Sequence, residues 1–199
     1  MNAELIHNII FYVMYASMVL LGVIFIERVI YFSWTLKQSK KLNHELIKNT
    51  QINEDQITNK DRNPAYALIK PLLNNASLSL HEKSDIVEQQ YLNSKGHLNK
   101  GLWILDTIVT AAPLLGLLGT ILGIVDTFQA LAASGVSDAS KVSGGMGTAL
   151  YATGLGIAIA LVALVANNFL TSRMEKINEL SKILLIQVSK DKKNNQRYA

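Results

Sequence analysis

TAAPLLGLLGTILGIVDTF, the stretch from Thr110 to Phe128, is apolar enough to cross a membrane, yet it contains three glycines, one proline and a central threonine, Thr120. A helix that only anchors a chain in lipid needs none of these residues, because leucine, isoleucine and valine hold it in the bilayer. Small residues allow two helices to approach closely in lipid, where packing and hydrogen bonds drive their association. The stretch therefore predicts a membrane helix that packs tightly against a neighbour.

Three uncharged segments are long enough to span a bilayer, which takes about 20 apolar residues. They are Ile9–Ile26, Thr107–Val125 and Met146–Leu170, in a chain that is 49% apolar and 17% charged. Because no Lys or Arg precedes the first segment and no small-residue cleavage site follows it, we expect a retained anchor rather than a cleaved signal peptide. The sequence predicts an all-α membrane protein with three transmembrane helices and long cytoplasmic helical extensions.

The basic residues are concentrated in two segments, and their distribution indicates how the chain crosses the membrane. Residues 28–100 contain eleven Lys and Arg and residues 171–199 contain seven, whereas residues 1–8 contain none and residues 129–145 only one. Positively charged segments remain on the cytoplasmic side, so we expect the N-terminus outside. The expected layout is an external N-terminus (1–8), transmembrane helix 1 (9–32), a cytoplasmic helical domain (33–101), transmembrane helix 2 (102–128), an external loop (129–145), transmembrane helix 3 (146–170) and a cytoplasmic C-terminal helix and tail (171–199).

Local signals predict helices within the cytoplasmic segments. Residues 27–48 continue the first helix in pattern, whereas residues 53–64 are polar and turn-rich and predict a loop. Ser79 followed by Glu82 has the spacing of a capping box and predicts a helix from Leu80. Gly96 and Gly101 leave open whether that helix runs on into the second span. Apolar residues after residue 173 recur at helical spacing and predict an amphipathic extension of the third helix: Met174, Ile177, Leu180, Ile183, Leu184 and Val188.

Small residues recur every four positions on the second and third spans and predict close contact in the membrane. The columns are Ala112, Gly116 and Thr120, with Gly119 and Gly123, on the second span, and Ala152, Gly156 and Ala160, beside Ala149 and Thr153, on the third. Pro113 removes the hydrogen bond to the carbonyl of Val109 and can kink the helix, so this carbonyl needs a cavity or another partner. We expect Pro113, Gly116 and Gly156 to shape the helix interface and a pore beside it.

Thr120 and Thr153 are expected at nearly one depth in the membrane. Thr120 lies about 6 Å from the middle of its run and Thr153 about 7.5 Å from the middle of its own, both toward the outer leaflet. Either hydroxyl alone commonly bonds to the carbonyl four residues earlier in its own helix. Two hydroxyls at matched depth, each on a stripe of small residues, favour a shared polar seam. No ionisable residue lies in the body of a span, so the chain is either no channel or only part of one.

Other classes of function are not supported by the sequence. The chain has no cysteine, which excludes disulfides, zinc–thiolate sites and cysteine nucleophiles. GLLGT lacks the lysine of a phosphate-binding loop, and the histidines have no metal-ligand or catalytic spacing: His7, His44, His81 and His97. We expect no enzyme, cofactor or metal. The basic residues lie beside the membrane, which indicates contact with acidic lipids rather than nucleic acid, with Arg28, Lys37 and Arg173 as candidates.

Two segments together resemble a known family. APLLGLLGTILGIVDTF (Ala112–Phe128) and GMGTALYATGLGIAIALVALVANNF (Gly145–Phe169) are similar to the paired signature of the ExbB/TolQ/MotA proton-channel family, and IERVIYF (Ile26–Phe32) also resembles it. Three spans and a large cytoplasmic segment fit the ExbB and TolQ types better than the MotA type, which has an additional span.

The resemblance implies a subunit of an ion-driven motor in the bacterial inner membrane, with the periplasm outside. Such subunits form a homopentamer around the helices of a small single-span partner, ExbD-like or TolR-like, which contributes a titratable aspartate. Proton flow then energises a TonB-like transducer for transport across the outer membrane. Thr120 and Thr153 fall on the family's pore threonines, which implies that they solvate the partner's carboxylate and pass protons or order water.

One position departs from the family pattern. Thr148 stands five residues before Thr153, where many ExbB proteins have a glutamate, so a mechanism that requires this charge is not carried over. At about 100° per residue, the two threonines lie on different faces of the helix. Three interpretations stay open: an ExbB-like subunit, a TolQ-like subunit of the Tol–Pal motor, and a structural scaffold that does not conduct. The choice between protons and sodium also stays open.

Overall fold

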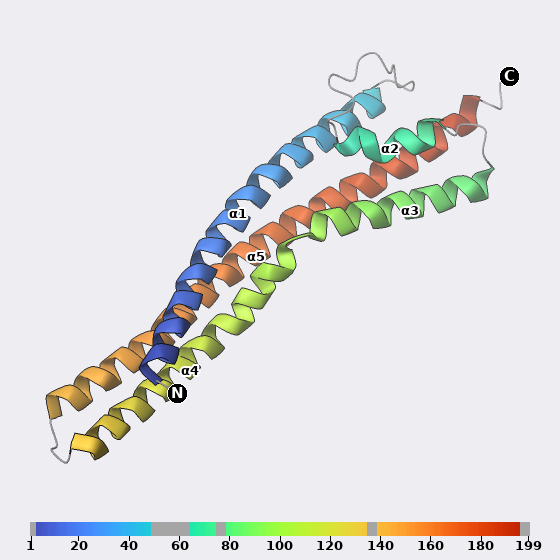
Figure 1. The fold of residues 1–199 in the computed structure, drawn as a ribbon. Helices are drawn as coiled ribbons and strands as arrows, with labels where there is room; N and C mark the ends of the chain where they lie inside the picture. The colour runs from blue at the N-terminus through green and yellow to red at the C-terminus, as the bar shows by residue number, and fades with distance from the viewer. Residues whose placement is uncertain (1–2, 49–63, 75–78, 135–138, 196–199) are drawn as a thin grey trace. The chain divides into compact units, whose positions relative to one another are not determined.

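Five helices make up the elements of the structure, a computed structural model (Figure 1). It describes residues 3–48, 64–74, 79–134 and 139–195. The helices are α1 (Ala3–Lys48), α2 (Pro64–Asn74), α3 (Leu80–Asn99), α4 (Leu102–Ser134) and α5 (Ala139–Asn195). The chain divides into two compact units: unit 1 contains Met1–Ile26 and Gly101–Phe169, and unit 2 contains Glu27–Lys100 and Leu170–Ala199.

Three of the helices contain segments long and apolar enough to cross a membrane. These segments lie within His7–Glu45 of α1, Leu102–Ala133 of α4 and Val142–Ser189 of α5. They confirm the predicted all-α membrane fold with three spans. The continuation of the first helix over residues 27–48 is also confirmed, because α1 runs unbroken to Lys48.

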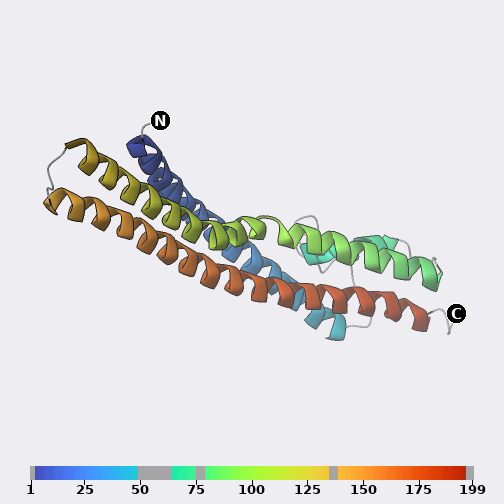
Figure 2. The same ribbon diagram turned by 90° about the horizontal axis from the view of Figure 1, so that it is seen from below.

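In unit 1 the first part of α1 lies beside α4 and the first part of α5 (Figure 2). Helices α4 and α5 run antiparallel there, and their contact contains small buried residues such as Ala112, Ala149 and Ala152. Many large apolar side chains are exposed around the unit, including Tyr12, which is 75% exposed, and Val165, which is 69% exposed. An extended apolar surface of this kind is typical of contact with lipid or with other subunits.

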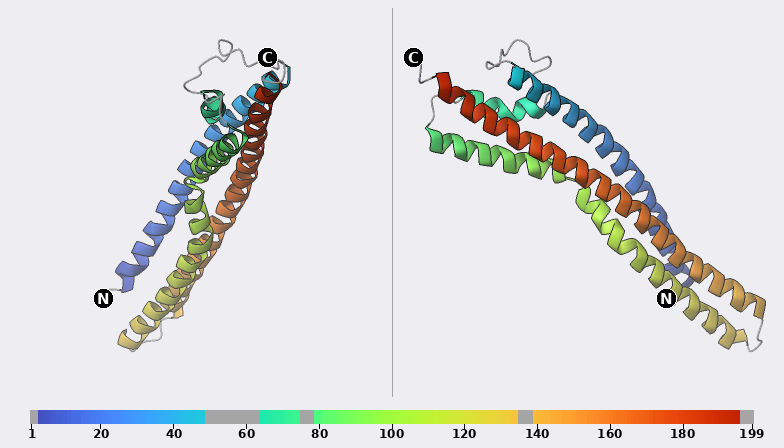
Figure 3. Two further views of the ribbon diagram at one scale, coloured as in Figure 1. Left: turned by 90° about the vertical axis from the view of Figure 1, so that its right-hand side faces the viewer. Right: turned by 180° about the vertical axis from the view of Figure 1, so that it is seen from behind.

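In unit 2 the rest of α1 packs with α2, α3 and the last part of α5 (Figure 3). Its core is formed by larger side chains: Leu42, Ala65, Tyr66, Leu68, Ile69, Leu72, Leu184, Leu185 and Val188. The predicted amphipathic extension of the third helix is confirmed, since Ile177, Leu184 and Val188 are buried. Ile183, however, is 44% exposed, and the adjacent Leu185 occupies the core instead.

The signals that start and stop α3 are explicit in the structure. The predicted capping box is confirmed: the Glu82 backbone N–H donates to Ser79 Oγ at 3.4 Å, and the Ser79 backbone N–H donates to Glu82 Oε2 at 2.8 Å. Helix α3 ends at Asn99, and Gly101 follows with a φ of 82°. That backbone conformation favours glycine strongly. Helix α3 therefore does not run on into α4.

The helices extend beyond the three expected spans. Helix α4 reaches Ser134 and α5 begins at Ala139, so a loop conformation is wrong for most of residues 129–145, and α1 already begins at Ala3 within the expected N-terminal segment (1–8). The side of the membrane on which these segments lie stays a prediction. Hydropathy indicates where contact with lipid ends, but a helix continues beyond that point as long as its residues have adequate helix propensity. Helix α2 was not predicted; it begins at Pro64, a residue suited to the first helical position because its missing N–H is not needed there. Residues 53–63 of the expected loop lie outside the described residues.

Candidate functional site

The contact between α4 and α5 in unit 1 depends on glycine. A Cβ atom on Gly116 would lie 2.8 Å from the carbonyl oxygen of Ala152, and one on Gly156 would lie 2.5 Å from the carbonyl oxygen of Ala112. Real Cβ atoms do not approach backbone oxygens this closely, and a packed interface resists added volume. The backbones of the two helices therefore touch, and we call this contact the α4–α5 seam.

Two further glycines continue the α4–α5 seam along α4. A Cβ atom on Gly119 would lie 2.9 Å from the Cβ of Ala152, and one on Gly123 would lie 2.8 Å from the Cβ of Ala149. By contrast, nothing lies within 4 Å of a Cβ atom on Gly154. Only the glycines on one face of each helix are thus required by packing.

The α4–α5 seam brings Thr120 and Thr153 together. Their hydroxyl oxygens are in direct hydrogen-bonding contact, and both side chains are half-buried. Thr153 also donates to the carbonyl of Gly116 across the seam at 3.1 Å. Thr120 can donate to the same carbonyl, in its own helix, at 3.1 Å, or to the carbonyl of Ala149 in α5 at 3.2 Å. The site therefore contains both kinds of hydrogen bond considered from the sequence: one within α4 and others between α4 and α5.

The two hydroxyls have more acceptors than protons. Each threonine hydroxyl donates one proton and accepts through two lone pairs. The carbonyls of Gly116 and Ala149 and the opposing hydroxyl cannot all receive a proton at once. The pair can thus be arranged in more than one way while the hydroxyls stay bonded to each other, and this is the chemical property that distinguishes the site.

Pro113 lies half-buried inside α4, and the helix continues on both sides of it from Leu102 to Ser134. It stands one turn before Gly116, on the half of α4 where Ala112 is almost fully buried. The structure therefore places Pro113, Gly116 and Gly156 in one short stretch of unit 1. An opening of the helix at Pro113 stays a prediction.

Charged groups lie near the ends of the α4–α5 seam and not beside the threonines. Asp106 is exposed near the start of α4, where the side-chain amide of Asn167 reaches one of its carboxylate oxygens at 3.5 Å. Asp126 is half-buried six residues beyond Thr120. Within the described residues, no group of three or more His, Cys, Asp or Glu could hold a metal ion.

A comparison of the chain with known protein families identifies the family to which its three spans and its two sequence signatures belong. Residues 56–182, more than half of the chain, match the MotA/TolQ/ExbB proton channel family. This chain belongs to that family. The match includes all of α3 and α4 and the part of α5 that carries Thr153.

Several members of the proton channel family are similar to the chain over part of its length. The biopolymer transport protein ExbB of Helicobacter pylori (strain J99) is 41% identical over 87 residues, which are 44% of this chain and 60% of the relative. A biopolymer transport protein ExbB homolog of Methanothermobacter thermautotrophicus is 32% identical over 126 residues, 63% of this chain and 44% of the relative. The ExbB protein of Pseudomonas putida is 29% identical over 161 residues, 74% of this chain and 49% of the relative. The chain thus spans less than two thirds of each relative.

Thr148, at the position where many ExbB proteins have a glutamate, is separate from the threonine pair. Its side chain is exposed, and its hydroxyl donates to the carbonyl of Gly144 in the same helix at 3.0 Å. The neighbouring residue Ala149 is fully buried in the α4–α5 seam. Thr148 therefore occupies a different face of α5 and cannot replace a hydroxyl of the pair.

The three candidate lipid contacts of this family member lie in unit 2 and differ in their surroundings. The guanidinium of Arg28 lies 5.8 Å from the ring centroid of Tyr31, and its Nε is buried without a hydrogen-bond partner. Lys37 is exposed, whereas Arg173 is half-buried and already has an interaction partner. Lys37 is thus the most accessible of the three, and lipid contact stays a prediction for all of them.

His7 is a residue near the α4–α5 seam that the sequence did not single out. A Cβ atom on Gly123 would lie 3.5 Å from the Cε1 of His7, and the His7 ring also packs edge-on against Phe11. Its Nδ1 is buried without a hydrogen-bond partner. The candidate span of α1 begins at this residue. In the sequence, His7 is only a histidine two residues before the apolar run that begins at Ile9, and its role becomes apparent only when α1 packs against α4.

Proposed function

We propose that this chain is an ExbB-like subunit of an ion-driven motor in the bacterial inner membrane. With an ExbD-like single-span partner it uses the proton motive force to energise a TonB-like transducer for transport across the outer membrane. The proposal is supported by membership of the proton channel family and by ExbB relatives described as biopolymer transport proteins. The observation that carries it is the contact of the Thr120 and Thr153 hydroxyls beside the Gly116 carbonyl.

The hydroxyl pair has two bonded arrangements. In the first, Thr120 donates to Thr153, which donates to the carbonyl of Gly116. In the second, Thr153 donates to Thr120, which donates to the carbonyl of Ala149. A backbone carbonyl does not carry a proton onward, so a relayed proton would enter one hydroxyl from water, and the other hydroxyl would release its own proton to the partner's carboxylate or to a second water. Thr120 and Thr153 would therefore relay protons or orient water beside a charged group.

The partner supplies the charge in this proposal. Ion movement through a membrane generally requires an ionisable group within it, and the sequence of the α4–α5 seam has none between Asp106 and Asp126. A carboxylate on the single span of an ExbD-like partner would accept hydrogen bonds from the hydroxyls. Because both threonines are only half-buried in the single chain, they retain a side from which a partner helix can approach.

Assembly into a homopentamer would explain the outer surface of unit 1. Its exposed apolar residues, such as Tyr12, Leu114 and Val165, would contact lipid or neighbouring copies. The N-terminus would lie in the periplasm and residues 171–199 in the cytoplasm, because Lys and Arg are concentrated in residues 28–100 and 171–199 and such segments generally stay on the cytoplasmic side. Lys37 and Arg28 would then reach acidic lipid headgroups.

The test is a matched pair of substitutions at Thr153. Thr153→Val keeps the shape of the side chain but removes the hydroxyl, whereas Thr153→Ser keeps the hydroxyl. In cells that lack their own copy, we expect Thr153→Val to lower TonB-dependent uptake by about tenfold or more and Thr153→Ser to retain most of it. Crosslinking of the homo-oligomer should be equal for both. Full uptake with Thr153→Val would exclude Thr153 from the ion pathway.

A structural scaffold is the second candidate, and the α4–α5 seam itself favours it. Backbone contact at Gly116 and Gly156 holds helices together whether or not ions pass. A scaffold would lose function only when assembly is lost, so it predicts that both Thr153 variants are active. A TolQ-like role predicts the same loss for Thr153→Val, but in the Tol–Pal system and not in uptake through TonB.

A further inference from the structure

A second polar contact joins α4 and α5 in unit 1, away from the threonine pair. The side-chain amide of Asn167 donates to a carboxylate oxygen of Asp106 at 3.5 Å. Asp106 is exposed, whereas Asn167 is half-buried. A hydrogen bond of this length is weak. The amide therefore keeps the carboxylate on the side of α4 that faces α5, while the carboxylate can still accept hydrogen bonds from water.

The Asp106–Asn167 contact repeats the register of the threonine pair. Asp106 stands fourteen residues before Thr120, and Asn167 stands fourteen residues after Thr153. This spacing corresponds to about four helical turns and a rise of about 21 Å, so it returns a residue to nearly the same face of its helix. Because α4 and α5 run antiparallel, both contacts belong to the same face of the helix pair. The α4–α5 seam thus has a hydroxyl pair along its length and a carboxylate at one end.

Helix α4 has further polar groups between these two contacts. Pro113 has no backbone N–H, so the carbonyl of Val109 lacks the donor that it would have in a helix without proline. The exposed hydroxyl of Thr110 donates to carbonyls of the preceding turn, which leaves its lone pairs free to accept hydrogen bonds. Within a membrane, ordered water is one of the partners that satisfy backbone groups freed by proline. This half of α4 therefore offers acceptors to water between the threonine pair and Asp106.

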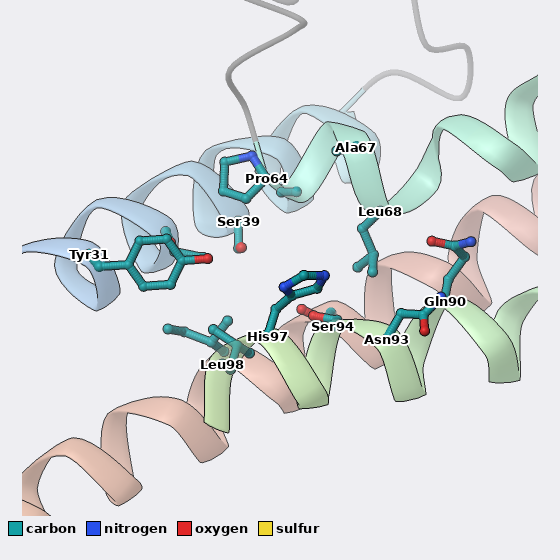
Figure 4. Close-up of a pocket in the computed structure, with 14 residues that line it drawn as sticks. Tyr31, Ser39, Pro64, Ala67, Leu68, Gln90, Asn93, Ser94, His97 and Leu98 are labelled. Carbon is teal, nitrogen blue, oxygen red and sulfur yellow. The ribbon is translucent and has the colours of Figure 1, made fainter. Parts of the chain in front are cut away.

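Unit 2 also contains polar side chains between helices, but they differ from this contact in charge. They line a cleft of about 500 Å³, with Thr35 and Ser39 on α1 and with Gln90, Asn93 and His97 on α3 (Figure 4). Asn93 and His97 are exposed and can bond to water. The described lining of the cleft contains no Lys, Arg, Asp or Glu. The contact in unit 1, by contrast, includes a carboxylate, which attracts cations.

The position of Asp106 on the chain indicates which end of the ion pathway it would serve. It is the only ionisable residue in the sequence from residue 101 to residue 125. The expected cytoplasmic segment ends at residue 101, so in the orientation of the proposed motor Asp106 lies where protons leave the membrane. A carboxylate at such an opening raises the local concentration of cations.

We propose that Asp106 is the proton acceptor at the cytoplasmic exit of the ion pathway, and that Asn167 is the positioning residue that holds its carboxylate over the α4–α5 seam. This inference rests on the proposed function. A proton from the partner's carboxyl group moves through water to Asp106: the O–H bond on the partner breaks, and an O–H bond forms on the Asp106 carboxylate. Asp106 then releases the proton to water in the cytoplasm, and its carboxylate again accepts the amide of Asn167.

The first test removes the charge of Asp106 and keeps its shape. Asp106→Asn still offers a carbonyl oxygen to Asn167, so crosslinking of the homo-oligomer should not change. In cells that make the complex, we expect Asp106→Asn to lower proton entry after an external acid pulse by about tenfold or more, and Asp106→Glu to retain most of it. A pH-sensitive fluorescent protein in the cytoplasm measures this entry.

The matched control for the first test is Asp126→Asn. Asp126 stands twenty residues beyond Asp106 and lies on a nearly opposite face of α4, so the same chemical change should leave proton entry unaltered. Full entry with Asp106→Asn, or an equal loss with Asp126→Asn, would overturn the proposal.

The second test exchanges the two side chains of the contact. Asp106→Asn combined with Asn167→Asp moves the carboxylate from α4 to α5 and keeps one carboxylate and one amide in contact. We expect this double variant to recover about half or more of the proton entry that Asp106→Asn loses, because the charge returns to the same place. The melting temperatures of the single and double variants should be similar, which a purely structural role cannot reconcile with a difference in proton entry. Absence of recovery would overturn the proposal.

Thr153→Val, measured in the same assay, separates this inference from the proposed function. If Thr153→Val lowers proton entry and Asp106→Asn does not, the ion pathway stands and its exit is another group. If neither variant changes proton entry, the proposed function fails together with this inference. Loss in both variants, with recovery by the exchange, supports both.

Discussion

Both units of the molecule bury hydroxyl groups between helices, but they differ in how close those helices come. In unit 1, Gly116 and Gly156 allow backbone contact, and the hydroxyls of Thr120 and Thr153 bond to each other. In unit 2, larger side chains line the space between helices, and the hydroxyl of Thr35 has no partner. The size of the neighbouring side chains thus decides whether two buried hydroxyls on facing helices can reach each other.

The two units should also differ in which change of side-chain volume destabilises them: truncation in unit 2 and enlargement in unit 1. The largest effect is expected for truncation in unit 2. Ile69 is fully buried in its core. Ile69→Ala should lower the free energy of unfolding by about 2–5 kcal/mol, because it removes packed methyl groups and leaves a cavity. Thermal or denaturant unfolding of the purified chain measures this. Ile183→Ala, at a side chain that is 44% exposed, is the control and should change stability by about 0.5 kcal/mol or less.

Enlargement should be the damaging change in unit 1. Gly156→Ala places a methyl group against the carbonyl of Ala112, so we expect a loss of about 1–3 kcal/mol in the free energy of unfolding. Gly154→Ala, two residues earlier on the same helix, adds the methyl group in open space. It should be neutral or should stabilise the helix by up to about 1 kcal/mol. Equal melting temperatures for the two variants would show that α4 and α5 do not meet as closely as described.

A double-mutant cycle measures the bond between the two hydroxyls. Thr120→Val and Thr153→Val should each destabilise the chain slightly, and the double variant should lose less than the sum of the two. The coupling free energy should be about 0.6 kcal/mol, the average for hydrogen bonds between membrane helices. Additive effects would mean that the two hydroxyls do not bond to each other.

The smallest effect is expected at the start of α3, outside both polar clusters. Hydrogen bonds from the side chain and backbone of Ser79 hold the pKa of Glu82 below its ordinary value of 4.5. A lowered pKa in the folded state means that the carboxylate stabilises the fold above pH 4.5 and loses this effect as the pH falls through the lowered value. Ser79→Ala should therefore lower the melting temperature by a few degrees at neutral pH.

The pH series separates this cap from other sources of stability. The difference in melting temperature between Ser79→Ala and the unmodified chain should shrink as the pH falls from 4.5 through the lowered pKa of Glu82 in the folded chain. A difference that stays constant from about pH 7 to about pH 3 would show that the carboxylate does not contribute to the cap.

Features set by local chemistry were predictable from the sequence. The spans follow from uncharged apolar runs, and the α3 start follows from Ser79 and Glu82 alone. The meeting of Thr120 and Thr153 could be anticipated because two antiparallel helices of known rise place equivalent depths opposite each other. The buried positions Ile177 and Val188 followed from helical spacing.

Features set by tertiary contact were not predictable in the same way. The break at Gly101 depends on a backbone angle, and a glycine in sequence does not reveal whether it adopts that angle. His7 gains its place near Gly123 only when α1 packs against α4. In the sequence, Gln90, Asn93 and His97 resemble a solvated helix face, and the cleft that they line becomes apparent only when α1 and α2 pack beside α3.

If the hydroxyl pair relays protons as proposed, its two bonded arrangements have a consequence for the direction of transport. Passage of one proton would leave both hydroxyls pointing the opposite way, so the pair would keep a record of the last transfer. The next proton could follow in the same direction only after Thr120 and Thr153 had each rotated back to break and remake their bonds. Such a reset would be a step of its own in each cycle, and heavy water should slow it even where the driving voltage is unchanged.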